Sequence, residues 1–502
     1  LAMMRSGDEL LDTLELNDID ADVGAWIADA LPERSPGPAL ADRQGDFGVT
    51  RRGTLVQWLV EAGYLSEARR IGEAFVVEPA QLIDYPDQWF SSRGDAWFGL
   101  GRVYAWLGDP DAARVALDRA LECYRRIDHH LLMAATQRVI LEEVVIPYRT
   151  EQVAERERLR AAAENAYRRA TGVADEGLIA GFASLGAMVL DGAWHEALGI
   201  VQDAHSRDQG IIVWRHRVAA VLARLERERG NLEETRQLIA VVLPAGPDTP
   251  PGSTTHLRAI EMQLLAADIA LDAGDLDLAG RWLDTLDAWL AWNGAVRWRA
   301  EALLARARWL AARGDLDQAI DQADRALAAA REPRQPLAEL AALRLRGELH
   351  GRRGHLEAAL EDLGLALARA EGCAAPYEVA LTRLSLADAR AAAGASVEAQ
   401  ALLRQACEEF EALGAQRALI SAREILMQIA GRDAVSPAPF GLSKREIEVL
   451  TLVAAGMTDA QVADQLSISY RTVTTHLTSI FNKLNVNSRV AATRIALEHG
   501  IV

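Results

Sequence analysis

A short phrase that recurs at a constant interval constrains the fold of this chain more than any other feature of the sequence. It occurs as GDLDLA, GDLDQA, GHLEAA and GASVEA, and its first glycines, Gly274, Gly314, Gly354 and Gly394, are 40 residues apart. A constant period of this length indicates stacked helical or strand units, each of which buries its apolar face on its neighbours. The sequence therefore predicts a solenoid rather than a single globular core.

Each phrase lies between two apolar segments with helical spacing. We expect the glycine to end the first helix in a left-handed turn, acids to open the second helix, and a small residue five positions after the glycine to let the two helices approach. The same pairing occurs upstream, at Gly63/Ala68, Gly108/Ala113, Gly192/Ala197 and Gly230/Thr235. No clear phrase occurs near residue 150, where a degenerate unit around Ala154 is expected, and PAGPDTPPGSTTH (244–256) predicts a loop.

These units resemble tetratricopeptide (TPR) repeats. The matching residues, in the order of the family pattern, are Trp97, Leu100, Gly101, Tyr104, Ala113, Leu117 and Ala120. The period of 40 residues exceeds the usual length of about 34, which longer helices would explain. The resemblance implies a concave surface that binds a protein or a small-molecule effector. Five tryptophans (Trp282, Trp289, Trp292, Trp298 and Trp309) either line a ligand pocket there or, as their helical spacing favours, pack in the core.

Charge is distributed unevenly along the chain. The formal net charge is −18, with 54 basic and 72 acidic side chains. Residues 440–502 hold six of the basic and five of the acidic ones, which leaves 48 and 67, a balance of −19, in the first 439 residues. Both lysines of the chain, Lys444 and Lys483, lie in this tail. Because a strongly negative surface repels nucleic acid, only the tail is expected to approach a polyanion.

The tail carries the start signals of several short helices. Ser443 with Glu446, and Thr458 with Gln461, have the spacing of a capping box, and Gly456 is expected to close the first helix. A turn over residues 467–469 separates the second helix from a third. Three short helices with a brief turn between the last two predict a helix-turn-helix.

The third helix is amphipathic. At 100° per residue, Val473, Leu477, Ile480 and Leu484 share a stripe expected to pack on Val462, Leu466 and Ile468. The opposite side carries Arg471, Thr474, Thr475, Thr478 and Asn482, and no acid occurs between Gln465 and Leu497. Such a helix is often simply solvated, but the acid-free polar face favours contact with DNA.

The span 442–502 closely resembles the LuxR-type helix-turn-helix. The matching segments are LSKREIEVLTLVAAGMTDAQVADQL, SISYRTVTTHLTSIFNKLNV and NSRVAATRIALEHGIV. The resemblance implies DNA contacts from Thr458, Ser469, Arg471, Thr472, Thr474, Thr475, Thr478, Asn482 and Lys483. It also implies dimerisation through the helix within 488–499, by Val490, Ala491, Arg494 and Ile495. Two positions depart from the family pattern, which commonly has Lys at Thr474 and Asn at Asp459.

Large ATP-binding LuxR-type regulators, which include the MalT-like group, join a nucleotide-binding module to such repeats and such a tail. A Walker A loop needs a lysine, and the first lysine is Lys444, so the chain is either the C-terminal part of such a regulator or a form without the ATPase. No nucleophile elbow or H-E-x-x-H motif occurs, and Cys123, Cys373 and Cys407 have no metal-ligand spacing. His129 and His130 are interpreted as a surface pair. We expect no catalytic residue, no metal and no cofactor.

The sequence as a whole predicts an all-α protein, with a TPR-like α-solenoid followed by a small four-helix LuxR-type domain. The expected ranges are an N-terminal segment (1–52), the repeats (53–430), a linker (431–441) and the DNA-binding domain (442–502). The predicted function is a transcriptional regulator, not an enzyme, that binds double-stranded DNA as a homodimer and responds to an effector on the repeats. Without a signal peptide or a long apolar run, we expect a cytoplasmic protein without membrane contact. The alternative is an interaction scaffold whose tail does not recognise DNA sequence.

Overall fold

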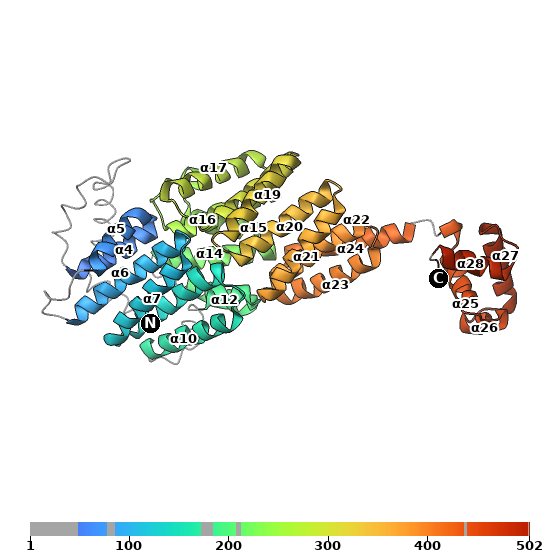
Figure 1. Ribbon diagram of the computed structural model, residues 1–502, viewed down its shortest axis with the longest axis horizontal. Coiled ribbons are helices and arrows are strands. Elements are labelled where there is room, and N and C mark those ends of the chain that lie inside the picture. Colours follow the sequence, from blue (N-terminus) through green and yellow to red (C-terminus); the bar gives the residue numbers. More distant parts are fainter. Residues whose placement is uncertain are drawn as a thin grey trace. The chain divides into compact units, whose positions relative to one another are not determined.

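The computed structural model describes residues 49–77, 86–171, 184–206, 212–435, 439–499 and 501 (Figure 1). Its regular elements over these ranges are all helices, so the all-α prediction is confirmed. The chain divides into two compact units, Leu1–Leu426 and Met427–Val502. Most of the predicted N-terminal segment, and Pro437 of the predicted linker, lie outside the described residues.

The helices of the first unit form consecutive antiparallel hairpins. They are α4 (Val49–Ala62), α5 (Leu65–Val76), α6 (Pro86–Trp106), α7 (Pro110–Arg126), α8 (His130–Val139), η1 (Ile140–Val145), α9 (Ile146–Tyr148), α10 (Val153–Thr171), α12 (Leu185–Leu190), α13 (Trp194–Ser206), α14 (Ile212–Arg229), α15 (Leu232–Val242), η2 (Gly246–Asp248), α16 (His256–Asp272), α17 (Leu276–Asn293), α18 (Arg299–Ala312), α19 (Leu316–Arg331), α20 (Pro336–Arg352), α21 (Leu356–Gly372), α22 (Pro376–Ala392), α23 (Ser396–Leu413) and α24 (Gln416–Val435). This TPR-like array is the architecture that the repeated phrase predicts.

The recurring glycines act as predicted. All eight have a positive φ, from 74° at Gly274 to 92° at Gly63 and Gly230, and each lies directly between two helices. At Gly314 the turn is closed by hydrogen bonds from Asp315 N to the Leu310 carbonyl (3.0 Å) and from Gly314 N to the Ala311 carbonyl (3.2 Å). The small residue five positions after each glycine has 0% exposure in all eight units. A larger side chain there would therefore force the two helices of a hairpin apart.

Neighbouring hairpins share their apolar side chains. Leu304 and Ala307 of α18, Leu327 of α19 and Leu343 of α20 belong to one buried cluster. Leucine on one helix therefore packs beside alanine on the next, and the three helices share one core.

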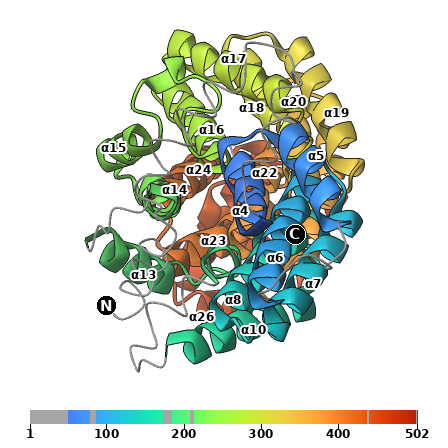
Figure 2. The ribbon, with the colours of Figure 1, turned by 90° about the vertical axis from the view of Figure 1, so that its left-hand side faces the viewer.

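The array also coils back on itself, so that segments far apart in sequence meet. The backbone amides of Val296 and Arg297 both donate to the carbonyl of Trp106, at 2.8 and 3.1 Å. Further along, Arg156 donates to the carbonyl of Cys373 (2.7 Å), and Arg417 pairs with Asp272 (2.6 Å). Figure 2 shows the helices of the array winding round in a superhelical turn. Each turn of the superhelix is thus joined directly to the next.

The unit near residue 150 departs from the repeat. Here α8 continues into the π-helix η1, and α10 packs back on α8 through Ala134, Ala163 and Tyr167. The degenerate unit around Ala154 therefore exists as a helical pair, but its turn has no repeat glycine. A π-helix widens the backbone spiral by one residue per bond and often marks a specialised site.

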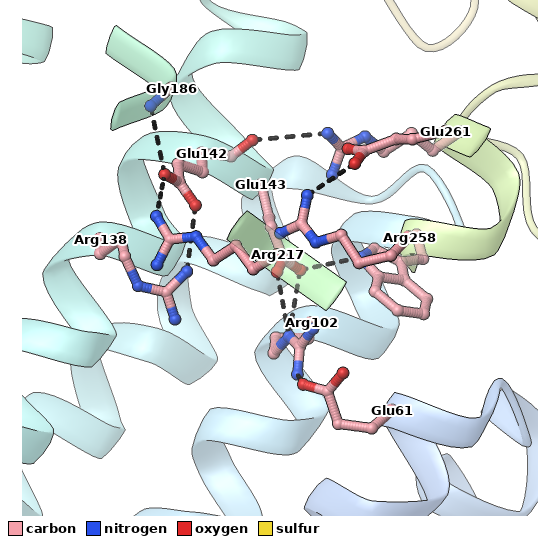
Figure 3. A network of polar contacts seen from close by, with 11 residues as sticks. Glu61, Arg102, Arg138, Glu142, Glu143, Gly186, Arg217, Arg258 and Glu261 are labelled. Atoms are coloured by element: carbon pink, nitrogen blue, oxygen red, sulfur yellow. Dashed lines mark hydrogen bonds and ion pairs between the residues drawn. The ribbon is translucent and has the colours of Figure 1, made fainter. Parts of the chain in front are cut away.

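Side chains from η1 lie at the centre of a buried network of ion pairs (Figure 3). Glu143 accepts hydrogen bonds from Arg102 Nε (3.1 Å) and Trp106 Nε1 (2.8 Å), and Arg102 also pairs with Glu61 of α4. Arg102 and Glu143 are only 5% and 2% exposed. Burial opposes ionisation of Glu143, but the charge and hydrogen bond of Arg102, together with the charges of Arg297 and Arg138, outweigh it and hold the pKa of this carboxyl below its usual value.

The neighbouring carboxylate, Glu142, joins further helices to the same network. It pairs with Arg138 of α8 (3.0 Å) and Arg217 of α14 (2.6 Å), and it accepts from the Gly186 amide (3.4 Å). Burial, together with the nearby charge of Arg138, lowers the pKa of Arg217 to about 10. The network of Figure 3 thus links α4, α6, α8, η1 and α14 through charges that little water reaches.

Most of the tryptophans singled out in the sequence are core residues. Trp282, Trp289 and Trp298 are at most 6% exposed, whereas Trp292 is 40% exposed and Trp309 is half-buried. Trp289 Nε1 donates to the Thr249 carbonyl (3.2 Å), which joins α17 to the segment predicted to be a loop. Between α15 and α16 this segment contains one short 3-10 turn, η2. The core interpretation therefore holds for the three buried side chains.

The repeats were expected to end at residue 430 and the linker to begin at residue 431. Helix α24 continues to Val435, within the range expected to be a linker, and the second compact unit begins at Met427. Over the described ranges, none of the helices combines the length and the apolar character needed to span a bilayer.

Candidate nucleic-acid interface

Four short helices follow the turn η3 (Pro439–Gly441) in the tail. They are α25 (Lys444–Ala454), α26 (Asp459–Gln465), α27 (Tyr470–Lys483) and α28 (Arg489–Glu498). Both predicted capping boxes form, Ser443 with Glu446 and Thr458 with Gln461. Each of these caps satisfies amides at both ends of the first helical turn.

The turn between α26 and α27 is short and locally determined. Ser467 has a φ of 52°, the Ile468 amide donates to the Ala463 carbonyl (3.0 Å), and Ser469 caps α27 by accepting from the Thr472 amide (3.1 Å). This geometry fixes the start of α27 relative to α26, as a helix-turn-helix requires.

The inner face of α27 packs in a core that belongs to the tail alone. Val473, Leu477, Ile480 and Leu484 are buried together with Val462. The partly buried side chains of Leu466 and Ile468 pack against the same core. The predicted buried stripe of the third helix is thus confirmed, and its opposite face is directed to solvent.

The outer face of α27 exposes the predicted DNA-contacting residues. Arg471, Thr474, Thr475, Thr478 and Asn482 are all exposed, and Tyr470 beside them is 60% exposed. The hydroxyls of the three threonines donate to carbonyls one turn earlier, Thr475 to Arg471 at 2.9 Å for example. These side chains therefore present methyl groups and acceptor lone pairs to solvent, while their donors are used within the helix.

Most of the cations in the tail are already paired with acids. Lys483 pairs with Glu446 (2.6 Å), Arg445 with Glu448 (2.6 Å), and Arg494 with Glu498 (3.6 Å). Arg489 pairs with Asp459 (2.7 Å). Among residues 439–499, Arg471 and Lys444 are the two basic residues without an ion pair. Arg471 lies at the start of α27, on the same exposed side as the three threonines.

The pairing of Lys483 with Glu446 also braces α27 against α25. Besides Lys483, the Glu446 carboxylate accepts from the Ser443 amide and from Ser479 Oγ, each at 2.5 Å. Burial would raise the pKa of Glu446, but the bond from Lys483 and those from the two serines outweigh it and lower the pKa to about 2. One carboxylate thereby caps one helix and anchors the far end of another.

Of the nine residues expected to contact DNA, those on the outer face of α27 lie together, Ser469 caps the start of α27, and Thr458 caps α26. Thr458 bonds to Gln461 and Ser469 to Thr472, so their polar atoms are partly occupied. A phosphate would compete with Glu446 for Lys483. The bracing role of Glu446 was not predicted, although its place in the capping box was.

The predicted dimerisation helix, α28, has one exposed apolar edge. Val490 is 79% exposed and Arg494 is exposed, while Ala491 and Ile495 are half-buried and Ile495 packs on the tail's own core. Leu497, which was not predicted, is 62% exposed. It lies one turn from Arg494 and two turns from Val490, on the same side of the helix.

The family described as "Bacterial regulatory proteins, luxR family" matches residues 441–496, a segment that holds α25, α26, α27 and most of α28. This segment is a LuxR-family helix-turn-helix domain. Asp459 is one of the two positions that depart from the family pattern. Its carboxylate pairs with Arg489 at the start of α28, which gives a local reason for an acid at this position. No corresponding contact explains threonine at position 474.

Similar proteins match either the whole chain or the LuxR-family domain. A protein of Mycobacterium tuberculosis, named as an HTH-type transcriptional regulator, is 27% identical over 503 aligned positions, which cover 95% of this chain and 52% of that protein. The transcriptional regulatory protein YdfI of Bacillus subtilis is 44% identical over 61 residues, 12% of this chain and 29% of YdfI. The chain thus spans about half the length of the mycobacterial relative.

Two solved structures align with most of the chain at low sequence identity. A Rap protein complexed with competence and sporulation factor is 13% identical, has a TM-score of 0.36, and matches over 77% of this chain and 98% of its own. A signal transduction ATPase with a tetratricopeptide repeat sensor, from Pyrococcus horikoshii, is 13% identical with a TM-score of 0.34, over 82% of this chain and 64% of its own.

Proposed function

We propose that the chain is a DNA-binding transcriptional regulator, in which the TPR-like array binds an effector and thereby controls a dimeric LuxR-family domain. The observation that supports it best is the outer face of α27, which is exposed and acid-free and begins with the unpaired cation Arg471. In the mycobacterial relative, the name also describes a transcriptional regulator. The proposal assigns binding, not catalysis, to both parts of the chain.

In the proposed complex, α27 lies in the major groove. The methyl groups of Thr474, Thr475 and Thr478 would contact thymine methyls, and their lone pairs would accept from base amino groups. Arg471 would bind a phosphate at the edge of the groove, with Thr458, Ser469 and Thr472 near the backbone. Because few cations are free, we expect binding to depend only modestly on salt and to rest on base contacts.

Two LuxR-family domains would associate through α28. Val490, Arg494 and Leu497 form an exposed edge whose apolar members are exposed by more than 60%. Contact between two such edges would bury these side chains and place two α27 helices on one duplex. The expected operator is therefore two-fold symmetric.

Selection of bound duplexes from a random-sequence pool by the purified chain tests this proposal. We expect enrichment of a motif with two related halves, and about fivefold weaker binding of the enriched duplex when Arg471→Ala replaces the wild-type chain. If neither the full chain nor a 439–502 fragment enriched any motif, the tail would not recognise sequence. The chain would then act as an interaction scaffold.

A further inference from the structure

A groove on the array lies between α6 and α7 and has a volume of about 760 Å³. Its apolar floor includes Phe90 and Trp97 of α6, which are half-buried, and Val115 of α7, which is 59% exposed. These residues recur at helical spacing, so the groove follows the two helices. From Val115 to Arg126 it extends over twelve residues of α7, or roughly 16 Å at the rise of an α-helix.

The charge of this groove differs from that of the array around it. Four arginines line it, Arg93, Arg119, Arg125 and Arg126, against a single acid, Glu122. Glu122 pairs with Arg119 at 3.3 Å, and both side chains are at least 60% exposed. A strongly cationic groove thus lies within a region whose balance is −19 before residue 440.

Elsewhere in the array, arginines commonly bridge helices. Arg306 of α18 pairs with Asp284 and Asp287 of α17, and Arg346 of α20 with Asp324 and Asp362. In the groove, Arg126 instead stacks on Phe90, with its guanidinium 4.8 Å from the ring centroid, and Arg93 donates to the Val76 carbonyl (2.6 Å). No ion pair engages Arg125 or Arg126 within the described ranges. Within the described ranges, no acid therefore neutralises the charges of Arg125 and Arg126.

The shape of the groove favours a helical occupant. Two antiparallel helices with an apolar valley between them form the same kind of surface on which the array packs its own next helix, as α20 packs on α18 and α19. A partner helix would place an apolar stripe on Phe90, Trp97 and Val115, and acids on its flanks would meet the arginines. We propose that this groove binds an acidic amphipathic helix of a partner protein. The inference specifies the effector chemistry and rests on the array's part in the proposed function, not on DNA recognition.

The test uses the full chain and a fluorescently labelled helical peptide of about 14 residues, with leucine at i, i+3, i+4 and i+7 and glutamate on both flanks. A second peptide carries lysine in place of each glutamate. Fluorescence anisotropy at moderate salt should show saturable binding of the acidic peptide and at least tenfold weaker binding of the basic one. Equal binding of the two peptides would overturn the proposal.

Charge reversal locates the site. The double variant Arg125→Glu, Arg126→Glu should weaken binding of the acidic peptide at least tenfold, because two attractions become repulsions. Arg168 and Arg169 provide a matched control, since they are adjacent exposed arginines in the last turn of α10, as Arg125 and Arg126 are in α7. Reversing the control pair should change the affinity less than twofold. An equal loss in both variants would show non-specific attraction and contradict a defined groove.

A third variant, Val115→Asp, tests the apolar contact at an exposed position where folding is not at risk, and it should weaken binding severalfold. Displacement of the acidic peptide by random duplex would assign the groove to nucleic acid. Self-association of the chain that the Arg125/Arg126 reversal abolishes would assign it to a second copy. Either result would overturn the proposal. Operator binding, measured on the same variants, should stay at the wild-type level, so that failure of DNA recognition and failure of the groove are separate results.

Discussion

The array and the LuxR-family domain use their charged residues in different ways. In the array, arginines are directed inward or across to the next helix, as Arg102 and Arg217 are to Glu143 and Glu142. In the tail, ion pairs such as Lys483 with Glu446 brace the scaffold, and the outer face of α27 keeps Arg471 unpaired. Ion pairs therefore stabilise both units, and the charged or polar surfaces left open are the groove between α6 and α7 in the array and the outer face of α27 in the tail. Under the proposed function, the first unit binds an effector and the second contacts DNA.

The largest effect should follow from breaking the buried network of the array. In Glu143→Ala, Arg102 would lose one of its two carboxylates and Trp106 its acceptor. Removal of one partner of a buried ion pair costs about 3–5 kcal/mol. We expect the free energy of unfolding of the array to fall by about 3 kcal/mol, as measured by urea denaturation with tryptophan fluorescence. The tail contains no tryptophan, so this signal reports the array alone.

A matched control for this prediction is Glu233→Ala. Glu233 pairs with Arg236 on the surface of α15, and its side chain is 77% exposed. Such a pair contributes little, so the unfolding midpoint should stay within experimental error of the wild-type value. Equal destabilisation by both substitutions would show that burial of the network has no special role.

Loss of the Glu446 carboxylate should destabilise the tail by a smaller amount, and this effect should depend on pH. The pKa of Glu446 is about 2 in the folded tail, below the ordinary value of 4.5, so the ionised form favours folding. This contribution is complete above about pH 4.5 and is lost as the pH falls towards 2. Glu446→Gln should lower the stability of a 439–502 fragment by about 2 kcal/mol at pH 7, measured by circular dichroism. A steep loss of stability between pH 4.5 and 2 that persisted unchanged in Glu446→Gln would contradict this assignment.

Substitution of one turn glycine in each unit should lower stability by a still smaller amount, and only in the unit that carries the substitution. Gly314 in the array and Gly456 in the tail have φ values of 91° and 86°, and a Cβ at either would have no atom within 4 Å. Alanine at either position is therefore strained but not crowded, at a cost of about 1.5 kcal/mol. Gly314→Ala should shift only the tryptophan-reported transition, and Gly456→Ala only the melting of the tail. A shift of both transitions by one substitution would show that the units unfold together.

The sequence predicted features that local residues determine. The glycines, the small residues five positions later, and the two capping boxes each need only a few neighbouring residues, and all of them form as expected. The buried stripe of α27 follows from helical angle alone, for the same reason.

The sequence could not show contacts between distant segments. Glu61, Arg102, Glu143 and Arg217 come from four separate helices, and nothing in their local sequence indicates that they meet around a π-helix. Lys483 was predicted only as a DNA contact, because its partner Glu446 lies 37 residues earlier. The groove between α6 and α7 is also a product of packing, since Phe90 and Arg126 become neighbours only when the hairpin closes.

Titration of the selected duplex tests whether the exposed face of α27 recognises DNA. Arg471→Ala and Lys444→Ala each remove one of the two unpaired cations of residues 439–499, so they change the net charge equally. With α27 in the groove, Arg471→Ala should weaken binding about fivefold and reduce the salt dependence by about one counterion per protomer. Lys444→Ala, at the start of α25, should have less than half of that effect on affinity. Equal losses from both, or no loss from Arg471→Ala, would contradict the placement of the DNA-binding face on α27.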